Sequence, residues 1–222
     1  MAQRLNTDIK GFQVDVLTRE AQAKLTPAEV RQRLEEGNAR FVGGEVTARN
    51  HVEQVRKAAL GQFPKAVVLS CLDSRIPVED VFDCGIGDLF VARIAGNFAN
   101  TDIIASMEFA CKVAGAKVVL VMGHEYCGAI MGAIDRVELG LLPALLDKLQ
   151  PAVEDALAQD PQAERSSKNA ALVQRVAERN VALTVEQIRR ESEVLRTLEA
   201  EGDLLILGAM YDMESARVTF FA

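Results

Sequence analysis

The sequence predicts an α/β fold, with a mostly parallel central sheet flanked by helices, an N-terminal helical arm and a C-terminal edge strand. Short runs of residues that are apolar at every position recur along the chain, as expected for strands covered on both faces. Helical stretches separate these runs, so strands and helices alternate. The chain has 222 residues, of which 49% are hydrophobic. That is enough for one large domain with a buried core.

The first predicted element is a helix that begins at Pro27. Thr26 is suited to cap it, Pro27 fits the first helical position, and the pattern continues to about Glu36. One face of this helical segment carries Leu25, Val30 and Leu34. We therefore expect residues 1–45 to form an N-terminal arm and helix, and residues 46–222 to form a single α/β domain. Because the apolar face of such an arm needs a surface to cover, we expect a second subunit to supply it.

Four apolar runs and a C-terminal segment define the predicted strands. The runs are AVVLS at 66–70, LFVA at 89–92, VVLVM at 118–122 and LLILG at 204–208. The segment ARVTFF, which starts at Ala216, predicts a last strand at the edge of the sheet. Helices are expected at about 101–114, 128–138, 143–157 and 166–200, the last of these as an amphipathic pair.

The composition argues against several classes of function. There are 25 Lys and Arg against 32 Asp and Glu, and the resulting net charge of −7 disfavours binding to nucleic acid. Only 5% of the residues are aromatic and none is Trp, which disfavours a stacking platform. No run of about 18 apolar residues is present, and polar residues interrupt the first segment. We therefore expect a cytoplasmic protein that does not bind membranes.

Three residues that can bind a metal follow predicted strands. Cys71 follows the run at 66–70, and His124 and Cys127 follow the run at 118–122. Ligands bind at the carboxyl ends of strands in open α/β sheets, and residues three apart on a first helical turn face the same way. Two thiolates and one imidazole suit Zn²⁺ and leave its fourth position open for catalysis. The simpler alternative is that these cysteines are buried packing residues, as most strand-end cysteines are.

An acid and a base next to the first cysteine strengthen the catalytic interpretation. Asp73 and Arg75 lie two and four residues after Cys71. Asp73 could take the open metal position or accept a hydrogen bond from water there, and Arg75 could keep it ionised. The sequence leaves both positions of Asp73 open.

The segments CLDSR at 71–75 and GHEYCG at 123–128 together resemble the signature of the β-class carbonic anhydrases. The resemblance extends from Leu25 to the terminal LGAMYDMESARV, which is nearly the whole chain. It implies that a zinc ion is held by Cys71, His124 and Cys127, and that Asp73 and Arg75 form a catalytic dyad. It also implies the activity, which is reversible hydration of carbon dioxide to bicarbonate and a proton by zinc-bound hydroxide.

Within that family the chain is more similar to the plant-like subgroup. The other subgroup has a Trp three residues before the first zinc cysteine, as part of a noncatalytic bicarbonate site, and Val68 stands there in this chain. Gln62 resembles a pocket glutamine that comes from the neighbouring subunit, which implies a homodimer or a dimer of dimers. Other positions that the resemblance places around the substrate are Phe90, Ile94, Ala95 and Gly128. Phe109 replaces the usual tyrosine, so any role of its hydroxyl is lost.

Two alternatives stay open at this point. One is hydrolysis of a carbon dioxide analogue, carbonyl sulfide or carbon disulfide, on the same scaffold. The other is a noncatalytic zinc-binding protein, which would be expected to lose Asp73 or Arg75, although this chain has both. The remaining cysteines, Cys84 and Cys111, are expected to be buried structural residues.

Overall fold

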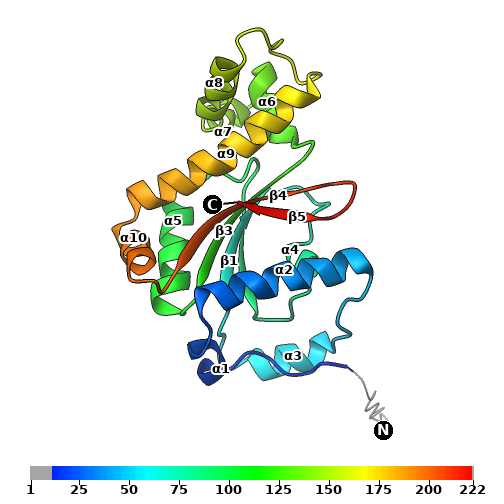
Figure 1. Ribbon diagram of the computed structural model, residues 1–222, viewed down its shortest axis with the longest axis vertical. Helices are drawn as coiled ribbons and strands as arrows, with labels where there is room; N and C mark the ends of the chain where they lie inside the picture. Colours follow the sequence, from blue (N-terminus) through cyan, green and yellow to red (C-terminus); the bar gives the residue numbers. More distant parts are fainter. Residues whose placement is uncertain (1–11, 222) are drawn as a thin grey trace.

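A five-stranded sheet forms the centre of the computed structural model, which describes residues 12–221 (Figure 1). The strand order is β2-β1-β3-β4-β5. The strands are β1 (Ala66–Ser70), β2 (Leu89–Arg93), β3 (Val118–His124), β4 (Leu205–Tyr211) and β5 (Val218–Phe221). The first four are mutually parallel, and β5 pairs antiparallel with β4 at the edge. The predicted fold class is confirmed, including its C-terminal edge strand.

Helices cover both faces of the sheet. They are α1 (Arg19–Ala23), α2 (Pro27–Gly43), α3 (His51–Ala58), α4 (Val78–Val81), α5 (Thr101–Glu108) with the π-helix η1 (Phe109–Val113), α6 (Gly128–Asp135), α7 (Leu142–Leu146), α8 (Gln150–Gln159), α9 (Ala170–Glu191) and α10 (Glu193–Ala200). Among residues 12–221, no helix is both long enough and apolar enough to cross a bilayer.

Several helix boundaries differ from the sequence prediction, two of them markedly. The helix predicted from Pro27 is α2, which continues past Glu36 to Gly43 and ends where Gly44 adopts a left-handed conformation, with φ of 69°. The helix predicted at 143–157 is divided into α7 and α8. The second part starts near Pro151, which has no N–H to continue the preceding helix. The predicted pair at 166–200 is confirmed as α9 and α10, separated at Ser192, which caps α10.

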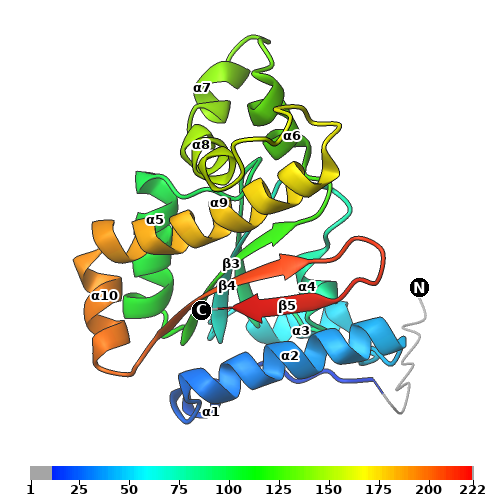
Figure 2. The same ribbon diagram turned by 45° about the horizontal axis from the view of Figure 1, so that its top comes forward.

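Alternate residues of each strand face two separate apolar layers. On β1, Val67 and Leu69 pack into the layer that includes α5, α6, α8, α9 and α10. Ala66 and Val68 face the opposite layer, which includes α2 and α4. Figures 1 and 2 show α9 crossing one face of the sheet while α2 lies on the other side. Burial on both faces explains why the strand sequences are continuously apolar.

Helix α2 covers the sheet of its own chain. Val30 and Leu34 of α2, together with Leu25 just before it, are buried in one apolar layer with the strands. The Asn38 side chain donates to the carbonyl of Ala216 and accepts from the N–H of Val218, which ties α2 to the start of β5. Figure 2 shows α2 running beside β5. The expectation that this face needs a second subunit is therefore wrong. Residues 1–11 of the predicted arm lie outside the described residues.

Candidate active site

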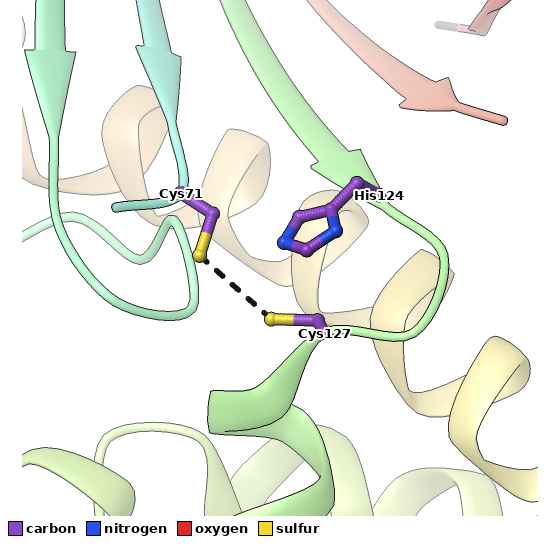
Figure 3. Close-up of side chains that lie close together, drawn as sticks. All are labelled: Cys71, His124 and Cys127. Atoms are coloured by element: carbon purple, nitrogen blue, oxygen red, sulfur yellow. Dashed lines mark hydrogen bonds between the residues drawn. The ribbon is translucent and has the colours of Figure 1, made fainter. Parts of the chain in front are cut away.

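Cys71, His124 and Cys127 converge at the carboxyl edge of the sheet. β1 and β3 are parallel neighbours, so Cys71, directly after β1, and His124, the last residue of β3, lie side by side. The ligand atoms of the three residues all lie within 4.8 Å of one another, and all three residues are buried. Figure 3 shows the two sulfur atoms and the imidazole turned toward one point. The convergence expected from the strand positions is present.

The route by which His124 and Cys127 meet differs from the helical turn that the spacing suggests. His124 still belongs to β3, and Cys127 is the N-cap residue of α6. The chain reverses between them through Tyr126, which has a left-handed φ of 53°. A bulky residue adopts this conformation at a cost, so the surrounding structure must hold the turn in place.

The three side chains fit a tetrahedral zinc ion. The Nδ1 atom of His124 lies 2.8 Å from the carbonyl oxygen of Glu125, so the N–H is on Nδ1 and Nε2 carries a lone pair. That Nε2 atom is buried and has no hydrogen-bond partner among the described residues. The sulfur atoms of Cys71 and Cys127 are 3.9 Å apart. Zinc–sulfur bonds of about 2.3 Å at a tetrahedral angle require about 3.8 Å. A soft divalent cation would satisfy all three groups.

The two thiols of the cluster differ in acidity. A hydrogen bond from the Cys127 thiol lowers the pKa of Cys71 to about 4, against the opposing effect of burial. The same contact with Cys71, together with burial, raises the pKa of Cys127. The pair therefore carries a negative charge at neutral pH, which suits a cation.

Arg75 binds both carboxylate oxygens of Asp73. Its Nε donates to Oδ1 at 2.9 Å and its Nη2 donates to Oδ2 at 2.7 Å, and the backbone N–H of Arg75 also donates to Oδ1 at 3.0 Å. These hydrogen bonds lower the pKa of Asp73 to about 2. The carboxylate is thus ionised and is paired with Arg75, outside the group formed by Cys71, His124 and Cys127.

Arg93 is a site residue that the sequence reasoning missed. From the end of β2 its Nε donates to the carbonyl of Cys71 at 3.0 Å, and its Nη2 donates to the carbonyl of Asp73. Arg93 therefore fixes the backbone that carries one candidate ligand and the candidate acid. The sequence does contain a signal for this role. Arg93 is a cation at the carboxyl end of an otherwise apolar strand, where ligands bind.

Three of the expected pocket residues lie next to the cluster. The N–H of Ile94 donates to the carbonyl of Ser70 at 3.2 Å, which places Ile94 and Ala95 beside Cys71. Gly128 directly follows Cys127 as the first residue of α6. All three residues are therefore close to the candidate ligands Cys71 and Cys127.

The two other expected pocket residues, Phe90 and Gln62, do not lie near the metal-ligand cluster of their own chain. Phe90 pairs with Val67, four strand positions before Cys71, or about 13 Å along the sheet. It lines a surface hollow of about 580 Å³ together with Phe109. Gln62 is exposed and precedes β1, so it lies near the amino-terminal ends of the strands, whereas Cys71 lies at their carboxyl ends. Neither residue completes the site within one chain.

The other two cysteines are buried, as expected. Burial raises the pKa of Cys84 to about 11 and that of Cys111 to about 12. Both remain protonated thiols at neutral pH, consistent with structural roles.

Comparisons with known proteins agree with this geometry. The sequence profile of the carbonic anhydrase family matches residues 66–218. Carbonic anhydrase 2 of Mycobacterium tuberculosis is 31% identical over 201 residues, which cover 86% of this chain and 91% of that protein. The structure of the β-carbonic anhydrase CafA of Aspergillus fumigatus matches with a TM-score of 0.68 and 27% identity, over 87% of this chain and 89% of that one.

A further structural match comes from a pair of β-carbonic anhydrases of Sordaria macrospora that are described as tetrameric. The TM-score is 0.67 at 25% identity, over 75% of this chain and 85% of that one. The family profile spans the strands and the motifs that carry the site. The chain therefore belongs to the carbonic anhydrase family, in its β class.

Proposed function

We propose that this β-class carbonic anhydrase interconverts carbon dioxide and bicarbonate at a zinc ion held by Cys71, His124 and Cys127. The observation that carries the proposal is the convergence of two sulfur atoms and a buried imidazole nitrogen on one point. In the part of the chain that the structure describes, this nitrogen has no hydrogen-bond partner. Zinc bound there would supply Lewis acidity that makes hydroxide available near neutral pH.

The protein's own groups would orient the reaction. Arg75 keeps Asp73 ionised and directs its carboxylate, which can then accept a hydrogen bond from the attacking water and so turn a lone pair toward carbon dioxide. We expect Ile94 and Ala95, which lie beside Cys71, to form part of the apolar wall that receives the substrate. Val68, which stands where the other subgroup has a Trp, supports assignment to the plant-like subgroup.

A stopped-flow assay of carbon dioxide hydration, with zinc measured on the same sample, tests the activity. We expect one zinc per chain and hydration that is lost when a chelator removes the metal and restored when zinc is returned. A parallel assay with carbonyl sulfide distinguishes the related hydrolase activity. A fully zinc-loaded protein that hydrates no carbon dioxide would contradict the proposal, and hydrolysis of carbonyl sulfide alone would favour the alternative.

We also propose that a second copy of the chain completes each pocket, in a homodimer or a dimer of dimers. Gln62 lies at the far edge of the sheet from its own Cys71, so it can serve a pocket only across a subunit boundary. β2 is an edge strand of the described sheet, and such an edge is available for pairing with another chain. The tetramers described for the Sordaria macrospora proteins are consistent with this assembly.

Mixing two inactive variants tests the shared pocket. Chains with Gln62→Ala and chains with Asp73→Asn are expected to be nearly inactive alone. Unfolded and refolded together in equal amounts, they should recover about a quarter of the parent activity, because half of the random dimers then contain one intact site. Light scattering at micromolar concentration should give a dimer or larger mass. An active monomer, or no recovery in mixed dimers, would contradict the proposal.

A further inference from the structure

A β-turn beside the candidate metal centre directs a backbone N–H at Cys71. The turn covers Ile94 to Asn97 and is closed by the N–H of Asn97, which donates to the carbonyl of Ile94 at 3.0 Å. Gly96, the third residue, has a φ of +82°, as a type II turn requires. In this turn the N–H of Gly96 donates to the sulfur of Cys71 at 3.4 Å.

Only glycine fits the third position of this turn. Its backbone is left-handed, and a Cβ atom there would lie 2.7 Å from Cδ1 of Leu149. Type I and type II turns differ by a rotation of the central peptide, here the one between Ala95 and Gly96. In the rotated form the carbonyl oxygen of Ala95, not the N–H, would face the sulfur. The orientation of this one peptide therefore decides whether Cys71 receives a hydrogen bond or a repulsive contact.

Asn180, on α9, holds the turn from the side of the helical layer. It is 4% exposed, and its Nδ2 donates to the carbonyl of Gly96 at 2.8 Å. Its neighbours on the helix, Ala177 and Val181, are buried apolar residues. An amide in such surroundings is unfavourable unless it is hydrogen-bonded. An apolar side chain would fill this position if only packing mattered. The hydrogen bond to the carbonyl of Gly96 therefore explains why residue 180 is an asparagine.

We propose that Asn180 is a positioning residue for the metal centre: by holding the carbonyl of Gly96, it keeps the N–H of Gly96 on the sulfur of Cys71. A hydrogen bond to a ligating thiolate reduces the charge that the sulfur donates and fixes the direction of the ligand. Asn180 therefore acts on the metal through a turn that is 84 residues away in sequence. The inference rests on the proposed assignment of Cys71 as a ligand.

Cobalt substitution tests this arrangement by spectroscopy. In the Co²⁺-loaded protein, a thiolate-to-cobalt charge-transfer band reports the electron density on the sulfur. Asn180→Leu keeps a similar size without a donor, and Asn180→Ser is smaller, with a hydroxyl too short to reach Gly96. We expect both variants to move the band to longer wavelength and to bind Zn²⁺ about tenfold more weakly, the lower end of the usual effect of losing such a partner.

Thr184→Val is the matched control, because Thr184 is a buried polar residue one helical turn further along α9. It should leave the band and the zinc affinity unchanged. An unshifted band in either folded Asn180 variant, or an equal shift in Thr184→Val, would overturn the proposal. A parent protein that binds Co²⁺ without any thiolate band would instead refute the metal-site assignment.

Discussion

Cys127→Ser is expected to deprive the protein of its zinc. Cys127, Cys71 and His124 supply three ligand atoms within 4.8 Å of one another, and a serine hydroxyl is a much poorer zinc ligand than a thiolate. The loss in zinc affinity should exceed the roughly 10- to 100-fold that removal of an outer partner causes. Cys71→Ser and His124→Ala should act in the same way. Metal analysis of each purified variant, with competition against a chelator, measures the effect.

Cys111→Ala is the control for this series. Cys111 is a buried thiol whose pKa burial raises to about 12, and it lies outside the group of three. Its replacement should leave zinc content unchanged, whatever it does to thermal stability. If Cys127→Ser retained full zinc content at the parent affinity, the ligand assignment would be wrong.

Asp73→Asn is expected to keep the zinc but to lower kcat by about 10² to 10⁴, the scale for a positioned acid–base group. Asp73 lies outside the group of candidate ligands, so its amide form leaves the metal bound. The asparagine amide can donate a hydrogen bond to the attacking water, whereas the role proposed for the Asp73 carboxylate is to accept one from it. Arg75→Ala should act through Asp73, because Arg75 binds both of its oxygens. The double variant should therefore be little worse than either single one.

Stopped-flow kinetics on zinc-matched samples provide the measurement. Glu79→Gln, at an exposed carboxylate on α4, controls for the loss of one negative charge and should hydrate carbon dioxide at the parent rate. Independent, multiplying losses in the Asp73 and Arg75 variants would show that the two residues do not form one unit. A parent rate in Asp73→Asn would require a different base.

Short-range signals allowed much of the fold to be predicted. Each parallel strand is apolar at consecutive positions because both faces of the sheet are covered, and this pattern is visible without the structure. Thr26 and Pro27 marked the first helix because capping depends on residues within one turn, and the capping box is present. Helix ends were less predictable. A glycine such as Gly37 often marks a helix end, but α2 continues through it. Gly37 is needed there because the helix lies against the backbone of Phe82, where no side chain would fit.

By itself, the sequence determined the fold class, the family resemblance and the residues that meet at the sheet edge. Cys71 and His124 could be placed together because parallel neighbouring strands end at a common edge. Only the tertiary structure decided that Asp73 pairs with Arg75, that α2 covers its own sheet, and that Asn180 supports the turn at Gly96. These features depend on side-chain direction and on contacts between distant segments. Such contacts arise only when packed layers bring the segments together, and no local pattern encodes them.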